Sequence, residues 1–300
     1  MGNISKPHQK ILDENLYISE SDILKKQVSA DGTVKYLFGL RDKNAIESVF
    51  MRYNHGNTVC VSTQVGCRMG CAFCDSAIGG LDRNLSPSEM LMQVMAVQKD
   101  MGERVSNVVL MGIGEPLDNF GNTVKFLELL NGRDGLNIGY RHISVSTCGI
   151  ADKIKELKEI NIPVTLSVSI HAPNDGIRNR LMPVNKKWGV GKLLEACREY
   201  AKSTKRRISF EYALIGGIND SEENARELAG KLKNILCHVN LIPLNRVARG
   251  NFSRPDQKKA RIFQRTLESR GINATIRRRC GSDIDAACGQ LRKNNQSIDI

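Results

Sequence analysis

The chain has 300 residues, 41% of them hydrophobic, which is enough for one α/β barrel or two smaller domains. No apolar run reaches the roughly 18 residues of a membrane span, and no signal peptide precedes the first charged residues. We therefore expect a cytoplasmic protein without a membrane partner. Nine cysteines in such a chain favour metal or thiol chemistry over a disulfide scaffold.

The formal net charge of +12 is concentrated in the second half of the chain. Residues 1–150 contain 15 Lys/Arg against 16 Asp/Glu, whereas residues 151–300 contain 29 against 16. Such an excess favours a basic surface for a polyphosphate partner, although a solvated basic face has the same composition. The candidate phosphate contacts are Lys202–Arg207, Arg246–Arg261 and Arg277–Arg279.

The expected elements begin with a loosely ordered lead-in over residues 1–20, which are polar and lack a periodic pattern. A β extension over residues 21–57 follows, with a strand pair at Val34–Gly39 and Ile46–Arg52. From residue 58 to residue 300, β-rich runs alternate with helical patterns. The expected strands are Thr58–Val65, Ser106–Met111, His142–Thr147, Pro163–Ile170, Arg207–Ile215, His238–Pro243 and Asn273–Ile276. The expected helices are Pro87–Met101, Thr123–Leu130, Ala151–Ile160, Gly189–Ser203, Ser221–Leu236 and Asp256–Ser269.

The first helix of this alternating region has a well-marked start. Ser86 is placed to cap it, Pro87 suits the first helical position, and Glu89 completes a capping box. About six repeats of strand and helix require parallel strands joined by right-handed crossovers. We therefore predict an α/β protein with a partial (β/α)6 barrel, whose chemistry lies at the carboxyl ends of the strands.

Three cysteines, Cys67, Cys71 and Cys74, follow the first barrel strand in a C-x3-C-x2-C pattern. Soft thiolates suit an iron–sulfur cluster or zinc. A structural zinc site takes four ligands, and no fourth cysteine or histidine lies nearby in the sequence. Three cysteines instead leave one iron of a 4Fe–4S cluster open to another ligand. Zinc completed by a distant cysteine is the alternative.

This pattern, with Phe73 before the last cysteine, resembles the signature of the radical S-adenosylmethionine (SAM) superfamily. The resemblance implies that the open iron binds the amino and carboxylate groups of SAM and that Phe73 lies beside the cofactor. Ordinary core packing is the alternative for Phe73. One strand later, Gly112–Pro116 resembles the superfamily's segment for the SAM amino group, although a Gly-Glu-Pro turn alone is weak evidence.

The segment Asp283–Leu291 narrows the resemblance further. It reads DIDAACGQL and is similar to the terminal motif of the RlmN family, radical SAM enzymes that methylate carbon 2 of adenine in 23S ribosomal RNA. The similarity extends from about residue 20 to residue 291. It includes Gln64–Cys67, Met111–Pro116, Ser169–Asp175 and Asn240–Pro243.

The resemblance implies three catalytic residues. Cys288 would take a methyl group from one SAM as a thiolate, and a radical generated from a second SAM would activate that methyl group for addition to carbon 2. Cys60 would release the product through a transient disulfide with Cys288, and Glu47 would accept the proton from carbon 2. The alternatives are a buried, inert thiol for Cys60 and an exposed strand carboxylate for Glu47.

Further SAM contacts are implied at or near predicted strand ends, where they would line one pocket. Each is individually compatible with a structural role, as when a histidine satisfies a local hydrogen bond. Ile170 stands where relatives often have leucine, which changes little if its backbone makes the contact. The set is Gly114, Glu115, Ser146, Ser169, Ile170, His171 and Asn245.

Two features depart from the family pattern. Cys148 and Cys280 lie close to the motifs, where relatives usually lack thiols. Each is either a passive buried residue or able to form an off-pathway disulfide with Cys288. Cys197 and Cys237 fall in predicted helix or helix-end positions and are expected to be structural. Family enzymes also carry a helical accessory domain, whereas about 20 residues precede the aligned part here. This departure does not affect the implied SAM chemistry, and it leaves RNA affinity and RNA choice open.

Three functions remain open. The first is methylation of adenine carbon 2 in 23S rRNA, with tRNA as a possible second substrate, by a monomer that uses a 4Fe–4S cluster, SAM and an electron donor such as flavodoxin. The second is the carbon-8 reaction of Cfr-type relatives, which Pro116 disfavours because those relatives carry alanine there. The third is a non-catalytic RNA-binding module that holds zinc.

Overall fold

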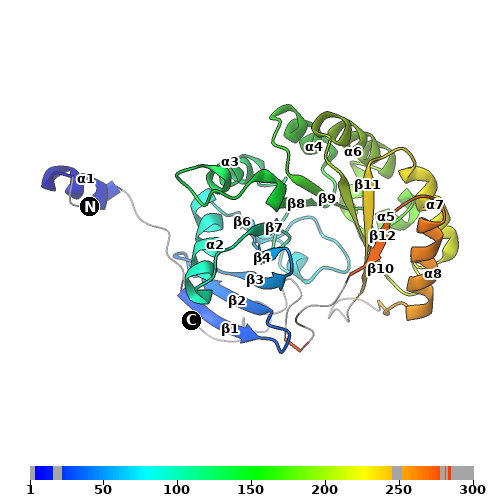
Figure 1. The fold of residues 1–300 in the computed structure, drawn as a ribbon, viewed down its shortest axis with the longest axis horizontal. Coiled ribbons are helices and arrows are strands. Elements are labelled where there is room, and N and C mark those ends of the chain that lie inside the picture. The colour runs from blue at the N-terminus through cyan, green and yellow to red at the C-terminus, as the bar shows by residue number, and fades with distance from the viewer. Residues whose placement is uncertain (1–3, 16–21, 245–251, 278–280, 282, 285–300) are drawn as a thin grey trace.

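The computed structural model describes residues 4–15, 22–244, 252–277, 281, 283 and 284 (Figure 1). The strands are β1 (Asp22–Val28), β2 (Val34–Gly39), β3 (Ala45–Tyr53), β4 (Gly56–Cys60), β5 (Gln64–Gly66), β6 (Leu81–Asn84), β7 (Asn107–Leu110), β8 (Ile143–Thr147), β9 (Thr165–Ser169), β10 (Ile208–Leu214), β11 (Cys237–Pro243) and β12 (Ala274–Ile276). The α-helices are α1 (Lys6–Asn15), α2 (Pro87–Met101), α3 (Phe120–Asn131), α4 (Ala151–Glu159), α5 (Asp175–Leu181), α6 (Val190–Thr204), α7 (Glu222–Leu232) and α8 (Gln257–Glu268). Three 3-10 turns are η1 (Asp75–Ala77), η2 (Tyr140–His142) and η3 (Pro183–Lys186).

The main sheet has ten strands in the order β1-β2-β3-β4-β7-β8-β9-β10-β11-β12. From β4 to β12 every neighbouring pair is parallel, which confirms the predicted partial β/α barrel. Figure 1 shows the helices along the outer side of this curved sheet. Because the strands are parallel, their carboxyl ends share one rim of the barrel.

The β extension continues the same sheet. β1 and β2 are antiparallel, as are β2 and β3, and β3 pairs antiparallel with β4. The predicted strand pair at Val34–Gly39 and Ile46–Arg52 is therefore confirmed as β2 and β3. The extension brings side chains of β2 and β3 to the edge of the barrel beside β4.

The strand register divides the sheet into an apolar outer face and a more polar inner face. Val34, Phe50, Val59, Val108 and Ile143 lie side by side in one row, and all are at most 2% exposed. The row one residue further along contains Lys35, Val49, Cys60, Val109 and Ser144. Because successive side chains alternate between the faces, the first row packs under the helices and the second faces the barrel interior.

Several predicted elements differ from the structure. The predicted strand Thr58–Val65 is two strands, since β4 ends at Cys60 and β5 pairs instead with β6. Between them the Val61 N–H donates to the Val109 carbonyl over 3.0 Å and the Thr63 N–H donates to the Ile113 carbonyl over 2.8 Å. The lead-in contains the ten-residue helix α1, where no helix was predicted. The elements β1, β6 and α5 were also not predicted.

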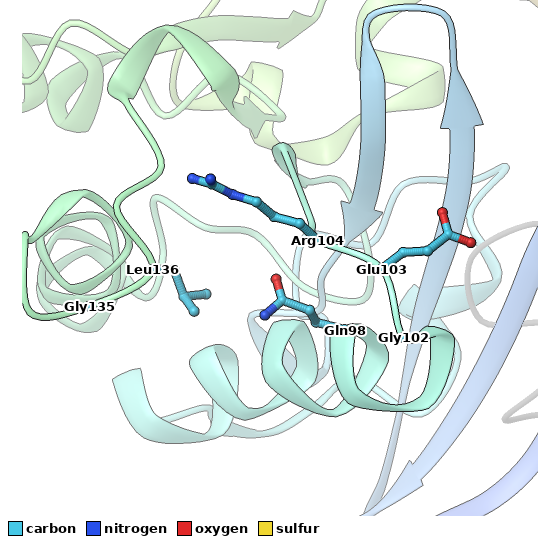
Figure 2. Close-up of a pocket in the computed structure, with 6 residues that line it drawn as sticks. All are labelled: Gln98, Gly102, Glu103, Arg104, Gly135 and Leu136. Carbon is cyan, nitrogen blue, oxygen red and sulfur yellow. The ribbon is translucent and has the colours of Figure 1, made fainter.

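A cavity of about 540 Å³ lies at the opposite end of the barrel from the predicted chemistry. Its lining comes from the end of α2 and from the connection between α3 and β8 (Figure 2). Both segments precede parallel strands, so they lie at the amino ends of those strands. None of the predicted site residues lines this cavity, whose walls are Gln98, Gly102, Glu103, Arg104, Gly135 and Leu136.

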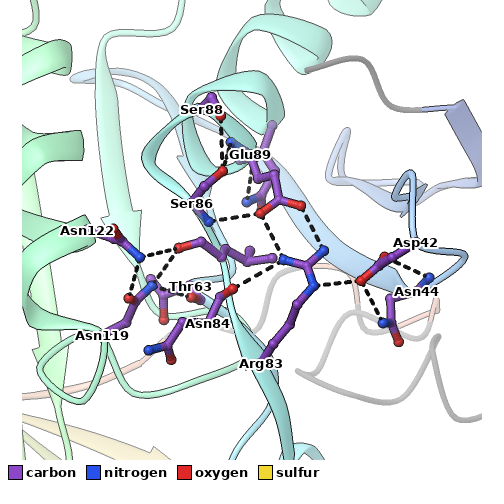
Figure 3. Close-up of polar contacts among 12 residues, drawn as sticks. Asp42, Asn44, Thr63, Arg83, Asn84, Ser86, Ser88, Glu89, Asn119 and Asn122 are labelled. Atoms are coloured by element: carbon purple, nitrogen blue, oxygen red, sulfur yellow. Dashed lines mark hydrogen bonds and ion pairs between the residues drawn. The ribbon is translucent and has the colours of Figure 1, made fainter. Parts of the chain in front are cut away.

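Arg83 on β6 fastens the β extension to the barrel (Figure 3). Its guanidinium donates to Asp42, in the turn between β2 and β3, over 2.6 Å. It also donates to Glu89 in the first turn of α2 over 2.8 and 2.9 Å. Glu89 in turn accepts from the Ser86 N–H over 2.8 Å, which completes the predicted capping box. Among the helices that the structure describes, none has the length and apolar character of a membrane span.

Candidate active site

The cluster loop begins directly after β5. Gly66 precedes Cys67 with φ +78°, and a Cβ at Gly66 would lie 2.1 Å from the Gly80 carbonyl oxygen. Only glycine tolerates both the conformation and the close approach. The Cys67 N–H donates to the same carbonyl over 2.8 Å, and the Ala72 N–H donates to the Leu181 carbonyl over 2.9 Å. These contacts hold the first cysteine and the residue after the second cysteine against neighbouring segments.

The three thiols of this loop share one partly buried volume. Burial, with added repulsion from Cys74 and Glu115, raises the pKa of Cys67 to about 12. Burial and the two neighbouring thiols also raise the pKa of Cys71. Such thiols ionise readily only beside a metal's positive charge, which fits a soft metal group.

Within the described residues no three His, Cys, Asp or Glu side chains gather as ligands of one metal ion. A 4Fe–4S cluster has no such requirement, because each thiolate binds a different iron.

The loop after β7 lies tightly against the segment between β4 and β5. A Cβ at Gly112 would lie 2.6 Å from the Val61 carbonyl oxygen, and one at Gly114, whose φ is +107°, would lie 2.6 Å from Cβ of Gln64. The Gln64 side-chain oxygen accepts from the Glu115 N–H over 2.8 Å. The glycines therefore allow the backbone of this loop to approach the segment from Val61 to Gln64 closely, just before the cluster loop.

Glu115 is 4% exposed, and both of its carboxylate oxygens have protein partners. One oxygen accepts from the Cys148 N–H over 2.6 Å and the other from the Leu117 N–H over 3.1 Å. Burial raises the pKa of Glu115 in spite of these bonds. The side chain thus ties the loop after β7 to the end of β8, which is one way in which it would shape a SAM pocket.

Arg178 on α5 is fully buried and fastens the carboxyl ends of β8 and β9. Its guanidinium donates to the carbonyls of Cys148, Ser169 and Ile170 over 2.6, 3.1 and 3.0 Å. It also donates to the Asn185 side chain over 2.8 Å. No salt bridge to Arg178 occurs among the described residues. Ser146 and Ser169 lie on the inner face of the two strands that Arg178 holds together.

His171 follows β9 and is 6% exposed with φ +51°, a conformation that few non-glycine residues adopt. Its Nδ1 accepts from the Ala213 N–H over 2.8 Å, and its carbonyl accepts from the Asn219 side chain over 2.7 Å. Burial and the Arg178 charge lower the pKa of His171 to about 3. The ring is therefore neutral and carries its proton on Nε2. Phe73 meets it edge-on with ring centroids 5.0 Å apart, which brings two predicted cofactor residues together.

Glu47 and Cys60 lie on the same inner face. Glu47 is 3% exposed, so the alternative that it is an exposed strand carboxylate is wrong. Its carboxylate lies 2.9 Å from the ammonium nitrogen of Lys35, which is fully buried. Cys60 lies in the same row as Lys35, two strands away. Burial raises the pKa of Cys60 to about 11, although the Met111 N–H and the charges of Arg277 and Lys35 oppose that rise.

Three of the predicted residues, Cys288, Asn245 and Cys280, lie outside the described residues. Cys148, Cys197 and Cys237 are free and buried, in agreement with passive roles. The basic segment Lys202–Arg207 precedes β10, so it lies at the amino end of the barrel, away from the site. Arg277 follows β12 directly, so it lies at the rim formed by the carboxyl ends of the parallel strands, where the predicted site residues lie.

Comparisons with known proteins agree with this arrangement. The model of the radical SAM superfamily matches residues 61–229. A protein of Desulforamulus reducens named probable dual-specificity RNA methyltransferase RlmN is 55% identical over 298 residues, 99% of this chain and 85% of that protein. A protein of the same name from Clostridium novyi is 54% identical over 98% of this chain and 86% of that protein. The crystal structure of a radical SAM methyltransferase from Sphaerobacter thermophilus superposes with a TM-score of 0.91 at 43% identity, over 96% of this chain and 86% of that one.

The chain belongs to the RlmN family of radical SAM enzymes. Membership makes the chain an enzyme, so the non-catalytic zinc module is set aside. Membership also implies a 4Fe–4S cluster and SAM as cofactors, and the three unpaired thiols of the cluster loop are a suitable donor set for the cluster.

Sequence reasoning missed two residues of this RlmN-family site. Lys35 was missed because nothing local distinguishes a buried lysine from an exposed one on a strand. The apolar residues around it in Val34–Gly39 could have indicated that this lysine is buried. Arg178 was missed because α5 was not predicted and because its partners are mostly backbone carbonyls, which leave no sequence pattern.

Proposed function

We propose that this RlmN-family enzyme methylates carbon 2 of an adenosine in 23S rRNA, and also in tRNA, through a methylated Cys288. The observation that carries the proposal is that one inner face of the sheet presents Glu47 and Cys60 together with Ser146 and Ser169. A proton acceptor, a thiol and the expected SAM contacts then border the same space. The names of the relatives support RNA as the substrate.

The cofactor residues follow from the site. Cys67, Cys71 and Cys74 would hold the 4Fe–4S cluster, with Phe73 beside it. When bound, the cluster and SAM supply one-electron chemistry that activates a carbon–hydrogen bond. The loop and strand-end residues would hold SAM, Ile170 through its backbone. Those residues are Gly114, Glu115, Ser146, Ser169, Ile170, His171 and Asn245.

Three residues of this chain would carry the transfer. The Cys288 thiolate takes the methyl group from SAM and presents it to the base. After the carbon–carbon bond forms, the Glu47 carboxylate removes the proton from carbon 2, and the unpaired electron left on the adduct would return to the cluster, which supplies the one-electron chemistry. The Cys60 thiolate then attacks the sulfur of Cys288, a Cys60–Cys288 disulfide forms, and the released carbon takes up a proton. Two electrons from an external thiol reopen the disulfide.

The partners follow from the same proposal. A flippable or single-stranded adenosine suits a pocket inside a barrel, because the base must leave its stack to be modified. Arg277 and the exposed lysines and arginines of α8 are candidate phosphate contacts. We propose that the enzyme works in the cytoplasm as a monomer and receives electrons from a small donor such as flavodoxin.

The direct test maps the methyl group on RNA. The reconstituted enzyme is incubated with SAM, a reductant and 23S rRNA or tRNA, and the modified nucleoside is identified by mass spectrometry against carbon-2 and carbon-8 standards. Methylation at carbon 2 supports the proposal, and methylation at carbon 8 assigns the chain to the Cfr-type reaction. Cys60→Ala should accumulate a covalent protein–RNA adduct that survives denaturation. Cys288→Ala should abolish transfer while it retains the cluster, and continued methylation by that variant excludes the carrier role.

A further inference from the structure

Residues just before the predicted carrier cysteine contact the turn between β1 and β2. Asp283 accepts hydrogen bonds from the Ser29 hydroxyl and, over 2.9 Å, from the Ala30 N–H. The Gly281 N–H donates to the Asp31 carboxylate over 2.9 Å. Figure 1 shows a short red stretch of the chain, coloured as the carboxyl-terminal part, beside the end of the β1–β2 hairpin. The sequence separation of these contacts is about 250 residues.

The contacts join the two edges of the main sheet. β12 is the last strand at one edge, and its chain is held as far as Arg277, whose N–H donates to the Leu241 carbonyl over 2.8 Å. β1 is the strand at the other edge. Gly281 and Asp283, which follow the strand at one edge of the sheet, are therefore held at the turn beside the strand at the other edge.

The turn has its own hydrogen bonds and does not depend on the segment that binds it. The Ser29 N–H donates to the Thr33 carbonyl over 2.8 Å, and the Thr33 N–H donates to the Asp31 carboxylate over 2.9 Å. Several hydrogen bonds lower the pKa of Asp31, and the one from the Gly281 N–H has the largest effect. The hydrogen bond from the Ser29 hydroxyl has the largest effect in lowering the pKa of Asp283. Both carboxylates are thus ionised at neutral pH and act as acceptors.

The length of the chain beyond this contact suits its function. Cys288 is the fifth residue after Asp283, so the chain between their Cα atoms extends at most about 18 Å. Thr33 in the turn is two residues from Lys35, a distance of about 7 Å along β2, and Lys35 is two strand spacings, about 10 Å, from Cys60. Thr33 is therefore about 12 Å from Cys60, and Ser29, which lies opposite Thr33 and one strand spacing further away, is about 16 Å from Cys60. Cys60 is thus within reach of a chain anchored at Ser29.

We propose that Ser29, Ala30 and Asp31 form a docking site for Gly281 and Asp283, and that this clasp shortens the tether of Cys288 and so raises its effective concentration at Cys60. The inference rests on the proposed carrier role of Cys288. Without the clasp the nearest described residue before Cys288 that is hydrogen-bonded to the sheet is Arg277, and the tether counted from it lengthens from 5 to 11 residues. The effective concentration of Cys288 at Cys60 should then fall at least about threefold, because it decreases roughly as the −3/2 power of tether length. Asp283, Asp31 and Ser29 are positioning residues in this scheme.

The test measures that effective concentration directly. The intact chain is equilibrated anaerobically with reduced and oxidised glutathione, and the Cys60–Cys288 disulfide is quantified by peptide mass spectrometry. Two thiols are oxidised while one oxidised glutathione becomes two reduced molecules, so the equilibrium gives the effective concentration. Asp283→Asn, Ser29→Ala and Asp31→Asn should each lower it, and Asp283→Glu should restore most of the wild-type value. Asp134→Asn, at an exposed carboxylate far from the clasp, is the matched control.

Two further measurements keep the outcomes separate. Melting temperatures of the variants should match the wild type within a few degrees, since Asp31 and Asp283 are exposed and the turn keeps the hydrogen bond between the Ser29 N–H and the Thr33 carbonyl. Equal effective concentrations in the wild type and in all three clasp variants overturn the docking site. Mass spectrometry of the wild-type enzyme after incubation with SAM tests the carrier itself, and absence of methyl on Cys288 refutes the proposed function while the glutathione result still decides the clasp.

Discussion

Lys35 and Glu47 form an ion pair of 2.9 Å on the inner face of the sheet, with both side chains at most 3% exposed. They project from adjacent strands of the β extension, in the part of the face that also contains Cys60. A buried carboxylate is stable as an anion only beside a cation. Lys35 is therefore the ion-pair partner of the proposed proton acceptor, so the extension supplies part of the proposed chemistry.

Lys35→Met should destabilise the protein by about 3–5 kcal/mol, because it leaves the Glu47 charge buried without its partner. Replacing both residues, as Lys35→Met with Glu47→Gln, should cost less than Lys35→Met alone, since no uncompensated charge remains. Urea denaturation of the wild type, both single variants and the double variant completes the cycle. Additive losses would show that the pair is not coupled.

Arg178→Lys is expected to weaken SAM binding at least tenfold. An ammonium group cannot span the carbonyls of Cys148, Ser169 and Ile170, so the ends of β8 and β9 lose their common anchor. Unfolding free energy should also fall by about 2–4 kcal/mol, since buried acceptors lose their donors. Calorimetric titration with SAM and urea denaturation measure the two effects. Arg180→Lys, on the exposed face of the same helix, is the control, and equal SAM affinity in both variants rules out the anchor.

The sequence was sufficient to predict the elements that depend on local signals. Helix α2 was predicted with the bounds that the structure gives, because Ser86, Pro87 and Glu89 mark its start. The alternation of strands and helices likewise predicted the parallel barrel. The break after Cys60 was missed because its cause is long-range: Val61 and Thr63 bond to the neighbouring β7 segment, and no glycine or proline marks the change.

The site shows the same limit. Cys67, Phe73, Gly114 and His171 could be predicted to lie in one region because each belongs to a short sequence motif. The burial of Glu47 depends on pairing between strands, which fixes the face on which each side chain lies. No local pattern reveals that pairing, so the sequence alone could not decide whether the Glu47 side chain is buried or exposed.

His171 should make the stability of the protein depend on pH below neutrality. Its pKa is about 3 in the folded chain against 6.5 in the unfolded chain. Between these values the unfolded chain binds a proton that the folded chain excludes, so stability falls as the pH falls, by up to about 1.4 kcal/mol per unit. His171→Asn, which tolerates the positive φ, should show a shallower slope in urea denaturation from pH 6.5 to 4. The exposed His55→Asn serves as control, and an unchanged slope for His171→Asn excludes this source of acid sensitivity.

Gly114→Ala should weaken SAM binding about tenfold or more with little loss of fold. The new Cβ would lie 2.6 Å from Cβ of Gln64, in a backbone conformation with φ +107° that costs a non-glycine residue about 1–3 kcal/mol. The loop after β7 must shift to relieve this contact, which moves the backbone expected to hold the SAM amino group.

Gly121→Ala is the matched control for that substitution, because nothing lies within 4 Å of its Cβ on α3. There the added methyl group should stabilise the helix by about 0.5–1 kcal/mol and leave SAM affinity unchanged. Both variants are compared by calorimetric titration with SAM and by melting temperature. If Gly114→Ala lowers only the melting temperature and binds SAM as the wild type does, the close approach at Gln64 serves packing of the loop and not the cofactor.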